Sequence, residues 1–189
     1  MEILLLDNKS QYSGELTACL EDLGVELDIQ SLPGAASEWE HSGVIISGGA
    51  IPHRDLSETL NQYQHLLNNL TKPLLAICLG LKIMAYCYGA RIRKMETPEV
   101  GLTSIQFHKS YPLAPSRSKL IVYEDHIFEL FSLPNILENY GSSEQCKIQA
   151  VKHKWKPQFG VQFHPEKNGN NDGHLIIENF VRLCYSGGY

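Results

Sequence analysis

The sequence lacks long apolar runs, closely spaced cysteine pairs and an excess of basic residues. No apolar run approaches the roughly 20 residues that a membrane helix needs, and the first residues do not resemble a signal peptide. Lys plus Arg number 16 against 21 for Asp plus Glu, which gives a net charge of −5 and disfavours non-specific nucleic-acid binding. We therefore expect a cytoplasmic protein that binds neither a membrane nor nucleic acid.

The cysteines form no recognisable metal or redox motif. There are five, widely spaced, and none belongs to a CxxC pair. In a reducing compartment most should be buried, small apolar residues. We predict no metal site, and only one or two of the thiols call for a chemical explanation. The five are Cys19, Cys78, Cys87, Cys146 and Cys184.

The pattern of apolar residues predicts a single α/β domain. A chain of 189 residues with 43% hydrophobic residues can bury one sizeable core, so we expect one domain over 1–189. In the first half, apolar strands alternate with helical periodicity, which favours a mostly parallel central sheet flanked by helices. The second half has short strands, read as a small antiparallel extension. Strands are expected at 2–6, 25–30, 44–46, 74–77, 103–107, 120–124, 148–153 and 160–163, and helices at 11–23, 56–70, 79–88 and 175–183.

Cys78 is a candidate nucleophile. It follows the apolar strand 74–77 and precedes Gly80 and a helix, which is the strand–turn–helix context of a nucleophile elbow. Gly80 would relieve crowding in so sharp a turn. A helix N-terminus favours a thiolate. The alternative is a buried cysteine that happens to precede a helix.

His164 and Glu166 are candidates for a general base and its carboxylate partner. They end the segment Gly160–Glu166, GVQFHPE, which is predicted to be a strand end. Side chains two residues apart on a strand share one side, so Glu166 is expected to orient the His164 ring. A cysteine, a histidine and a carboxylate complete a catalytic triad.

Ser47, Gly48 and Gly49 follow the strand 44–46. Paired glycines let backbone N–H groups approach an oxyanion. Alone, the motif is more typical of an ordinary turn.

Taken together, these motifs resemble the class I, triad-type glutamine amidotransferases. Their order and spacing match that family over nearly the whole chain, and GVQFHPE is a highly specific signature. Within the family the chain most resembles the separate glutaminase subunits of GMP synthase. This rests on the Leu6-Asp7-Asn8 start with Gln11-Tyr12, and on residues 143–159 before GVQFHPE. The resemblance implies a flavodoxin-like fold.

The resemblance also implies roles for individual residues. Cys78 would attack L-glutamine, His164 would transfer protons and Glu166 would hold His164. Backbone N–H groups of Gly49 and Leu79 would form the oxyanion hole. The chain would need no cofactor. ATP and Mg²⁺ would serve a separate ATP-pyrophosphatase, or synthetase, subunit that aminates XMP and joins this chain in a transient heterodimer. Substrate-binding positions implied by the family pattern are Gly48, Gly80, Lys82, His126, Ile127 and Phe128.

Five positions depart from the family pattern. Ala76 and Lys9 replace glycines, and Lys82 replaces a glutamine that holds the substrate. Of the usual Ser-His-x-Asp segment, residues 125–128 keep only His126, and Phe128 stands where the family has aspartate. Other functions therefore stay open: a glutaminase for another acceptor, as in anthranilate synthase, a weakly active regulatory module, or a hydrolase of γ-glutamyl compounds.

Overall fold

The computed structural model describes residues 1–32, 40–49 and 56–187. Within them, nine strands form one mixed sheet in the order β2-β1-β3-β4-β9-β8-β7-β5-β6. The first five strands in this order are mutually parallel, which is the 2-1-3-4-5 arrangement of flavodoxin-like folds. The predicted α/β class is therefore confirmed. The parallel strands are β1 (Glu2–Asn8), β2 (Glu26–Gln30), β3 (Gly43–Gly49), β4 (Leu74–Ile77) and β9 (Gln158–Val161).

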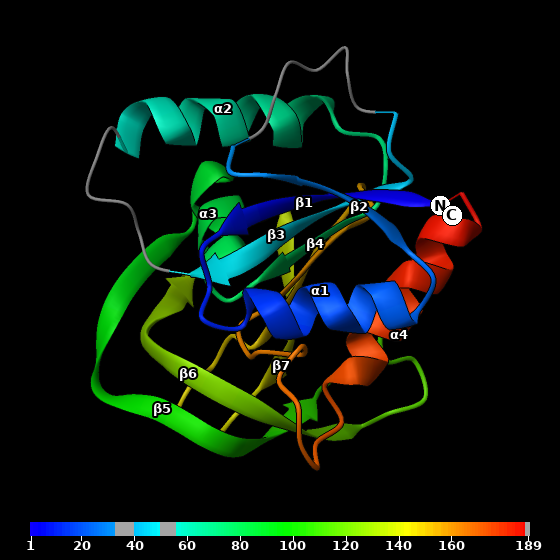
Figure 1. The fold of residues 1–189 in the computed structure, drawn as a ribbon. Coiled ribbons are helices and arrows are strands. Elements are labelled where there is room, and N and C mark those ends of the chain that lie inside the picture. The colour runs from blue at the N-terminus through cyan, green and yellow to red at the C-terminus, as the bar shows by residue number, and fades with distance from the viewer. Residues whose placement is uncertain (33–39, 50–55, 188–189) are drawn as a thin grey trace.

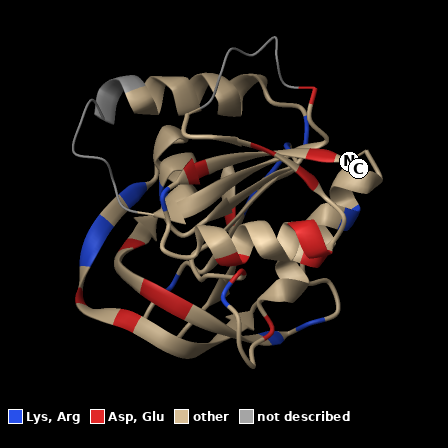
Figure 2. Ribbon diagram, in the orientation of Figure 1, with Lys and Arg blue, Asp and Glu red and all other residues tan. Residues whose placement is uncertain are grey.

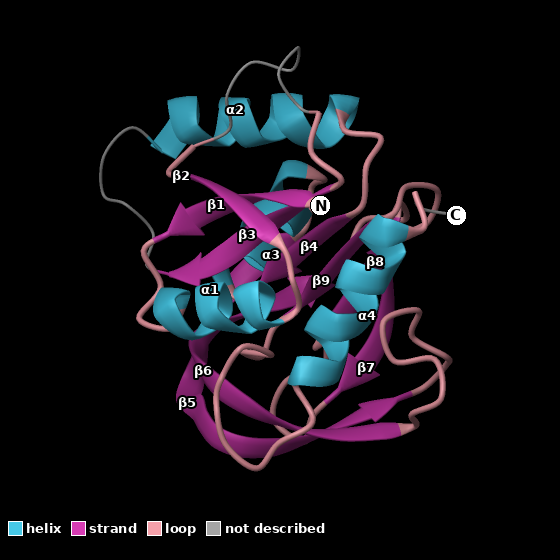
Figure 3. Ribbon diagram, turned by 45° about the vertical axis from the view of Figure 1, so that its right-hand side comes forward, coloured by secondary structure: helices cyan, strands magenta, loops and turns pink. Residues whose placement is uncertain are grey.

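Helices cover both faces of the parallel strands (Figures 1 and 3). Successive side chains of a strand point to opposite faces, so Ile3 and Leu5 join one apolar core while Leu4 and Leu6 join the other. Burial on both faces explains why these strands are continuous apolar runs. On one face lie α1 (Ser13–Asp22) and α4 (His174–Tyr185), and on the other α2 (Leu56–Asn69) and α3 (Leu79–Cys87).

The antiparallel part of the sheet is larger than the sequence predicts. Its two longest strands, β5 and β6, pair as a ribbon that curls away from the parallel strands (Figure 1). The sequence pattern predicts only 103–107 and 120–124 here, and no strand at 137–142. The β5–β6 ribbon and its neighbours are β5 (Arg91–Phe107), β6 (Lys119–Ser132), β7 (Leu137–Ser142) and β8 (Ala150–His153).

Charges of both signs lie along the β5–β6 ribbon. Figure 2 shows basic residues at the start of β5 and acidic residues along β6. Arg93 of β5 and Glu129 of β6 are cross-strand partners, and their side chains form a salt bridge of 2.8 Å. Cross-strand pairing of this kind stabilises the first, mainly exposed part of β5 against β6.

None of the described helices combines the length and the apolar character that a membrane span needs.

Candidate active site

Cys78 occupies a strained turn between β4 and α3. Its backbone angles are φ 48° and ψ −98°, and apart from Lys9 no other described non-glycine residue has positive φ. Such a conformation costs on the order of 1–3 kcal/mol and persists only where the surroundings impose it. The Cys78 N–H donates to the Val161 carbonyl of β9 at 2.8 Å. A Cβ at Gly80 would collide with the Ile46 carbonyl, so only glycine lets α3 start this close to β3.

The His164 ring is held on several sides. Its Nδ1–H donates to Glu166 Oε1 at 2.8 Å, which leaves Nε2 as the ring nitrogen free to meet Cys78. The Tyr12 ring packs edge-on against it, with centroids 4.6 Å apart. A Cβ at Gly48 would lie 2.9 Å from the ring, so Gly48 leaves room for it. The structure thus brings Cys78, His164 and Glu166 together.

The contact between His164 and Glu166 arises differently from the way the sequence suggests. The pattern predicts a strand through 160–163 whose alternation continues to the carboxylate. Strand β9 instead ends at Val161, residues 162–163 form a bend, His164 makes an isolated antiparallel bridge with Tyr123, and residues 165–166 form a turn. The His164 N–H donates to the Tyr123 carbonyl of β6 at 2.8 Å. The turn after His164 folds Glu166 back onto the ring, so strand alternation is the wrong reason for this contact.

Charges around Cys78 favour a thiolate. Burial opposes the charged form, but the Lys82 ammonium and the hydrogen bond with His164 lower the pKa of the Cys78 thiol below its usual value. Burial also opposes an imidazolium, but hydrogen bonds to Cys78 and Glu166 raise the pKa of His164 to about 10. These opposite shifts favour a thiolate–imidazolium pair, which supplies both a nucleophile and a proton donor.

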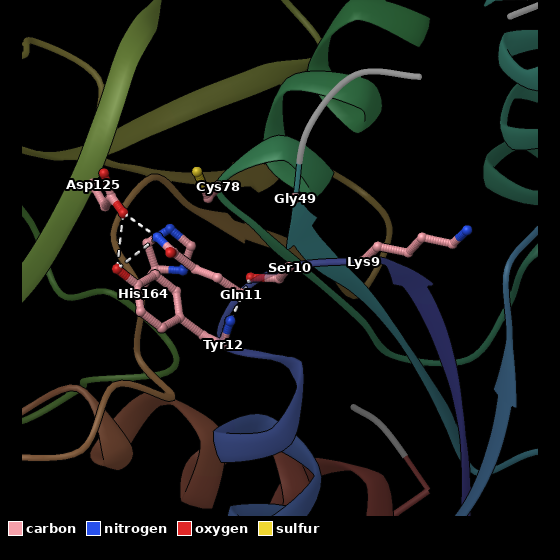
Figure 4. A pocket seen from close by; sticks show the side chains of 8 residues that line it. All are labelled: Lys9, Ser10, Gln11, Tyr12, Gly49, Cys78, Asp125 and His164. Carbon is pink, nitrogen blue, oxygen red and sulfur yellow. Dashed lines mark hydrogen bonds between the residues drawn. The ribbon is translucent and has the colours of Figure 1, made fainter. Parts of the chain in front are cut away.

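Two hollows open onto Cys78. Figure 4 shows the first, of about 320 Å³, with Cys78 and His164 beside the β1–α1 loop. Asp125 of β6 reaches this loop, since its carboxylate accepts hydrogen bonds from Gln11 Nε2 at 2.6 Å and the Tyr12 hydroxyl at 2.8 Å. The first hollow is lined by Lys9, Ser10, Gln11, Tyr12, Gly49, Cys78, Asp125 and His164.

The second hollow, of about 600 Å³, has mainly apolar walls. Gly49 ends β3 and Leu79 begins α3, so both proposed oxyanion donors border this hollow beside Cys78. The hollow is lined by Gly49, Cys78, Leu79, Lys82, Ile92, Pro98, Asp125, His126, Ile127 and Phe128.

Other sequence-predicted positions act mainly through packing. Gly80 lies against β3, and Gly48 lies against His164. Ala76, where the family has glycine, is fully buried in β4 and pairs with Ile46 and Gly160 in regular register. The additional methyl group is therefore accommodated within the core.

Sequence reasoning misses Gln11 and Asp125 as site residues. Gln11 follows the carboxyl end of β1, next to the point where the strand order reverses, and ligands of open parallel sheets bind there. The location of Gln11 just after a predicted strand is a signal that the sequence alone provides. Asp125 becomes recognisable only once the β5–β6 ribbon is seen to curl back toward the β1–α1 loop.

His126 belongs to a buried ionic cluster rather than presenting a free ring to the hollow. Its Nε2 lies 3.2 Å from Glu99 Oε2 and 3.3 Å from Glu124 Oε2, while Nδ1 meets the Phe128 carbonyl at 3.1 Å. Burial lowers the pKa of His126, but hydrogen bonds to Glu124 and Glu99 raise it to about 9. Burial raises the pKa of Glu124. A protonated ring between the two carboxylates therefore accounts for the cluster.

One set of described residues has the composition of a metal site. Potential ligand atoms of Glu99, His126 and Cys146 lie within 4.8 Å of one another. However, the Cys146 thiol donates to the Ile148 carbonyl at 3.5 Å, and burial raises its pKa to about 12. Metal ligation requires a thiolate and a neutral imidazole. This environment favours the protonated forms of both side chains.

Comparisons with known proteins agree with this geometry. The sequence profile of the family "Glutamine amidotransferase class-I" matches residues 4–184. The chain is 31% identical to a separate subunit of glutamine-hydrolyzing GMP synthase from Thermoplasma volcanium, over 97% of this chain and 92% of that protein. It is 33% identical to the Methanocaldococcus jannaschii protein of the same name, over 96% and 97%.

A solved structure supports the same relationship. A crystal structure from Thermoplasma acidophilum, provisionally described as the same GMP synthase subunit, superposes with a TM-score of 0.88. It is 30% identical in sequence, and the match covers 98% of this chain and 94% of that one. The profile match, the relatives and the shared fold together place this chain in the class I glutamine amidotransferase family.

Proposed function

We propose that this chain is the glutaminase subunit of a two-subunit GMP synthase. It would hydrolyse glutamine to glutamate and deliver the ammonia to a separate synthetase subunit that aminates XMP. The observation that carries the proposal is Cys78, held on a strained turn and bonded to His164, whose ring is oriented by Glu166. The GMP synthase relatives, which match almost end to end, support this choice of acceptor.

In the first chemical step the Cys78 thiolate attacks the side-chain carboxamide carbon of glutamine. The carbonyl oxygen becomes an oxyanion, which the backbone N–H groups of Gly49 and Leu79 would stabilise. The C–N bond then breaks as the nitrogen takes a proton from His164 Nε2. Ammonia leaves, a glutamyl thioester remains and the imidazole is neutral.

In the second step neutral His164 takes a proton from water, and the resulting hydroxide attacks the thioester. The C–S bond breaks, glutamate departs and Cys78 returns to the thiolate beside an imidazolium. Glu166 stabilises that imidazolium and keeps Nε2 directed at the reacting atoms. Water adds and ammonia and glutamate leave, so the cycle balances without a cofactor in this chain.

The synthetase subunit would supply the remaining chemistry. ATP and Mg²⁺ would act there to activate XMP, and the two subunits would meet as a transient heterodimer in the cytoplasm. Within this proposal, residues 1–189 serve as one amidotransferase domain, of which 4–184 match the family profile.

The proposal is tested by measuring glutamate formation from glutamine. The chain is assayed alone, with an ATP-pyrophosphatase-type synthetase subunit, and with that subunit plus XMP, ATP and Mg²⁺. We expect strong stimulation in the last condition, with one GMP formed per glutamate. Ammonium chloride in place of glutamine should support GMP formation without this chain.

Three results would contradict the proposal. Stimulation by an anthranilate synthase partner with chorismate, and none by the XMP-loaded subunit, would reassign the acceptor. Absence of glutamate formation in every condition, with the chain folded, would indicate a module that only binds its partner. Release of glutamate from γ-glutamyl peptides without any partner would indicate a hydrolase.

A further inference from the structure

Lys82 places an ammonium group directly beside the nucleophile. It lies one helical turn after Cys78, and its backbone N–H donates to the Cys78 carbonyl at 3.2 Å. The side chain folds back along the helix, so that Nζ lies 3.4 Å from the same carbonyl oxygen and 3.7 Å from Cys78 Sγ. An amine in that position contacts the reacting atom itself.

The burial of Lys82 makes this contact consequential. Only 6% of the residue is exposed, so water provides little screening of its charge. A buried ammonium needs a compensating anion. Within the described part of the chain no carboxylate is in ion-pair contact with Lys82 Nζ, which leaves the Cys78 sulfur as its anionic partner.

The neighbouring charged groups already have partners of their own. His164 is paired with Glu166, and on the β5–β6 ribbon His126 is paired with Glu99 and Glu124. Asp125, at the mouth of the hollows, accepts hydrogen bonds from Gln11 and Tyr12. His164 also hydrogen-bonds Cys78, so the sulfur has two cationic neighbours, and of these only Lys82 has no carboxylate partner among the described residues.

We propose that Lys82 is the counter-ion of the Cys78 thiolate and acts as a catalytic group in glutamine hydrolysis. The resemblance implies a neutral glutamine at this position, which would not supply a positive charge to the thiolate. The proposal rests on the proposed function only for the identity of the substrate. The contact between ammonium and sulfur does not depend on which acceptor receives the ammonia.

The counter-ion affects both halves of the cycle. Before glutamine is attacked, Lys82 stabilises the attacking thiolate. In the thioester the sulfur is no longer an anion, so the buried ammonium has lost its partner. Breakdown of the thioester restores the ion pair. Lys82 therefore favours the free thiolate over the acyl-enzyme and promotes turnover after acylation.

The test is the pH dependence of alkylation of Cys78 by iodoacetamide, which reports the thiolate without glutamine or a partner. The variants are Lys82→Met, which keeps an unbranched chain without charge, Lys82→Gln, which has the family residue, and Lys82→Arg, which keeps the charge. Cys78→Ala gives the background from the other thiols. Lys156→Met is the matched control, because Lys156 is a partly buried lysine that contacts the Leu67 and Asn68 carbonyls instead of Cys78.

We expect the alkylation midpoint to rise by about one pH unit or more in Lys82→Met and Lys82→Gln. Below both midpoints, the rate should then fall roughly tenfold. Lys82→Arg and Lys156→Met should stay near the parent chain. In glutamine hydrolysis, the acidic limb of kcat/KM should shift in the same direction.

An unchanged midpoint in folded Lys82→Met would overturn the proposal. So would a raised KM for glutamine with an unchanged midpoint, because that result assigns Lys82 to substrate contact. If Lys82→Met does not fold, the comparison of Lys82→Gln with Lys82→Arg decides in the same way. Failure of partner stimulation would contradict the GMP synthase proposal and leave the alkylation result untouched.

Discussion

The parallel strands and the β5–β6 ribbon both border the site, but they are built from different residues. β3 and β4 are almost entirely buried, and they carry Gly48, Gly49 and the approach to Cys78. β5 and β6 of the ribbon are much less completely buried, and they contribute Asp125 and the segment 126–128. The residues that border the hollows and depart from the family pattern lie in the loop after β1 or on the ribbon, with the exception of Lys82.

This difference in burial corresponds to two different tasks, catalysis and recognition. Bond-breaking chemistry requires atoms held within a fraction of an ångström, and the doubly covered parallel strands provide that rigidity. Recognition of the substrate tolerates more variation, and the exposed positions of the ribbon can vary without disturbing the core, to which its inward-facing residues such as Ile105 and Val122 belong. Predicted effects should therefore be largest in the parallel part and smaller on the ribbon.

The largest effect is expected for Cys78→Ala. Removal of the nucleophile should reduce glutamine-dependent ammonia release by about 10⁴-fold or more, while the fold survives because a small residue replaces another. Ammonia release and the melting temperature are the measurements. Cys87→Ala, at the other end of α3, is the matched control and should stay active. Full activity of Cys78→Ala would refute the assignment of the triad.

Gly48→Ala should have the next largest effect. Its methyl group would lie 2.9 Å from the His164 ring and push that ring away from Cys78. A displacement of about 1 Å costs roughly 10²-fold in rate, so we expect kcat to fall by that order. Steady-state kinetics measure it, with Gly14→Ala as control because a Cβ at Gly14 meets open space. Equal kcat values for the two variants would mean that the ring position is not critical.

The smallest effect is expected on the ribbon, in the pH dependence of stability. The folded-state pKa of His126 is about 9 against its ordinary value of 6.5, so its stabilising contribution is complete below pH 6.5 and is lost as pH rises through 9. The pKa of Glu124 is also raised, and its effect has the same sign.

The corresponding variant is His126→Gln. The free energy of unfolding should fall with rising pH in the parent chain, and fall less in the variant, by roughly 1 kcal/mol. Urea titrations below pH 6.5 and above pH 9 measure this difference. The pH-dependent contributions of Cys78 and His164 are the same in both proteins and therefore cancel. Identical slopes would show that His126 is not charged in the folded chain.

The contrast between the buried parallel strands and the antiparallel part of the sheet also decides which elements can be predicted from the sequence. The strand at 74–77 is predicted with correct bounds, because buried parallel strands are short apolar runs bounded by turn residues. The first part of β5 is missed, since it contains Arg91, Arg93, Lys94 and Pro98 and has no apolar alternation. β7 is missed because Asn139, Gly141 and Ser142 are typical of turns. Both are held by cross-strand pairing, which a local pattern does not reveal.

For the site, motifs predict which residues meet but not how they do so. Cys78, His164 and Glu166 follow from their positions at strand ends and from the family signature. The location of Lys82 Nζ beside sulfur, and the hydrogen bonds of Asp125 with Gln11 and Tyr12, depend on side-chain conformation and on the curl of the ribbon. These features depend on tertiary packing, which a linear sequence pattern does not encode.

The hydrogen bond from the Cys78 N–H to the Val161 carbonyl also bears on motion. It fastens the turn that carries the nucleophile to the end of β9, and His164 follows β9 only three residues later. Twisting or breathing of the sheet would therefore carry sulfur and imidazole along together. This shared attachment makes the relative position of nucleophile and base a property of β9 rather than of the loops around it.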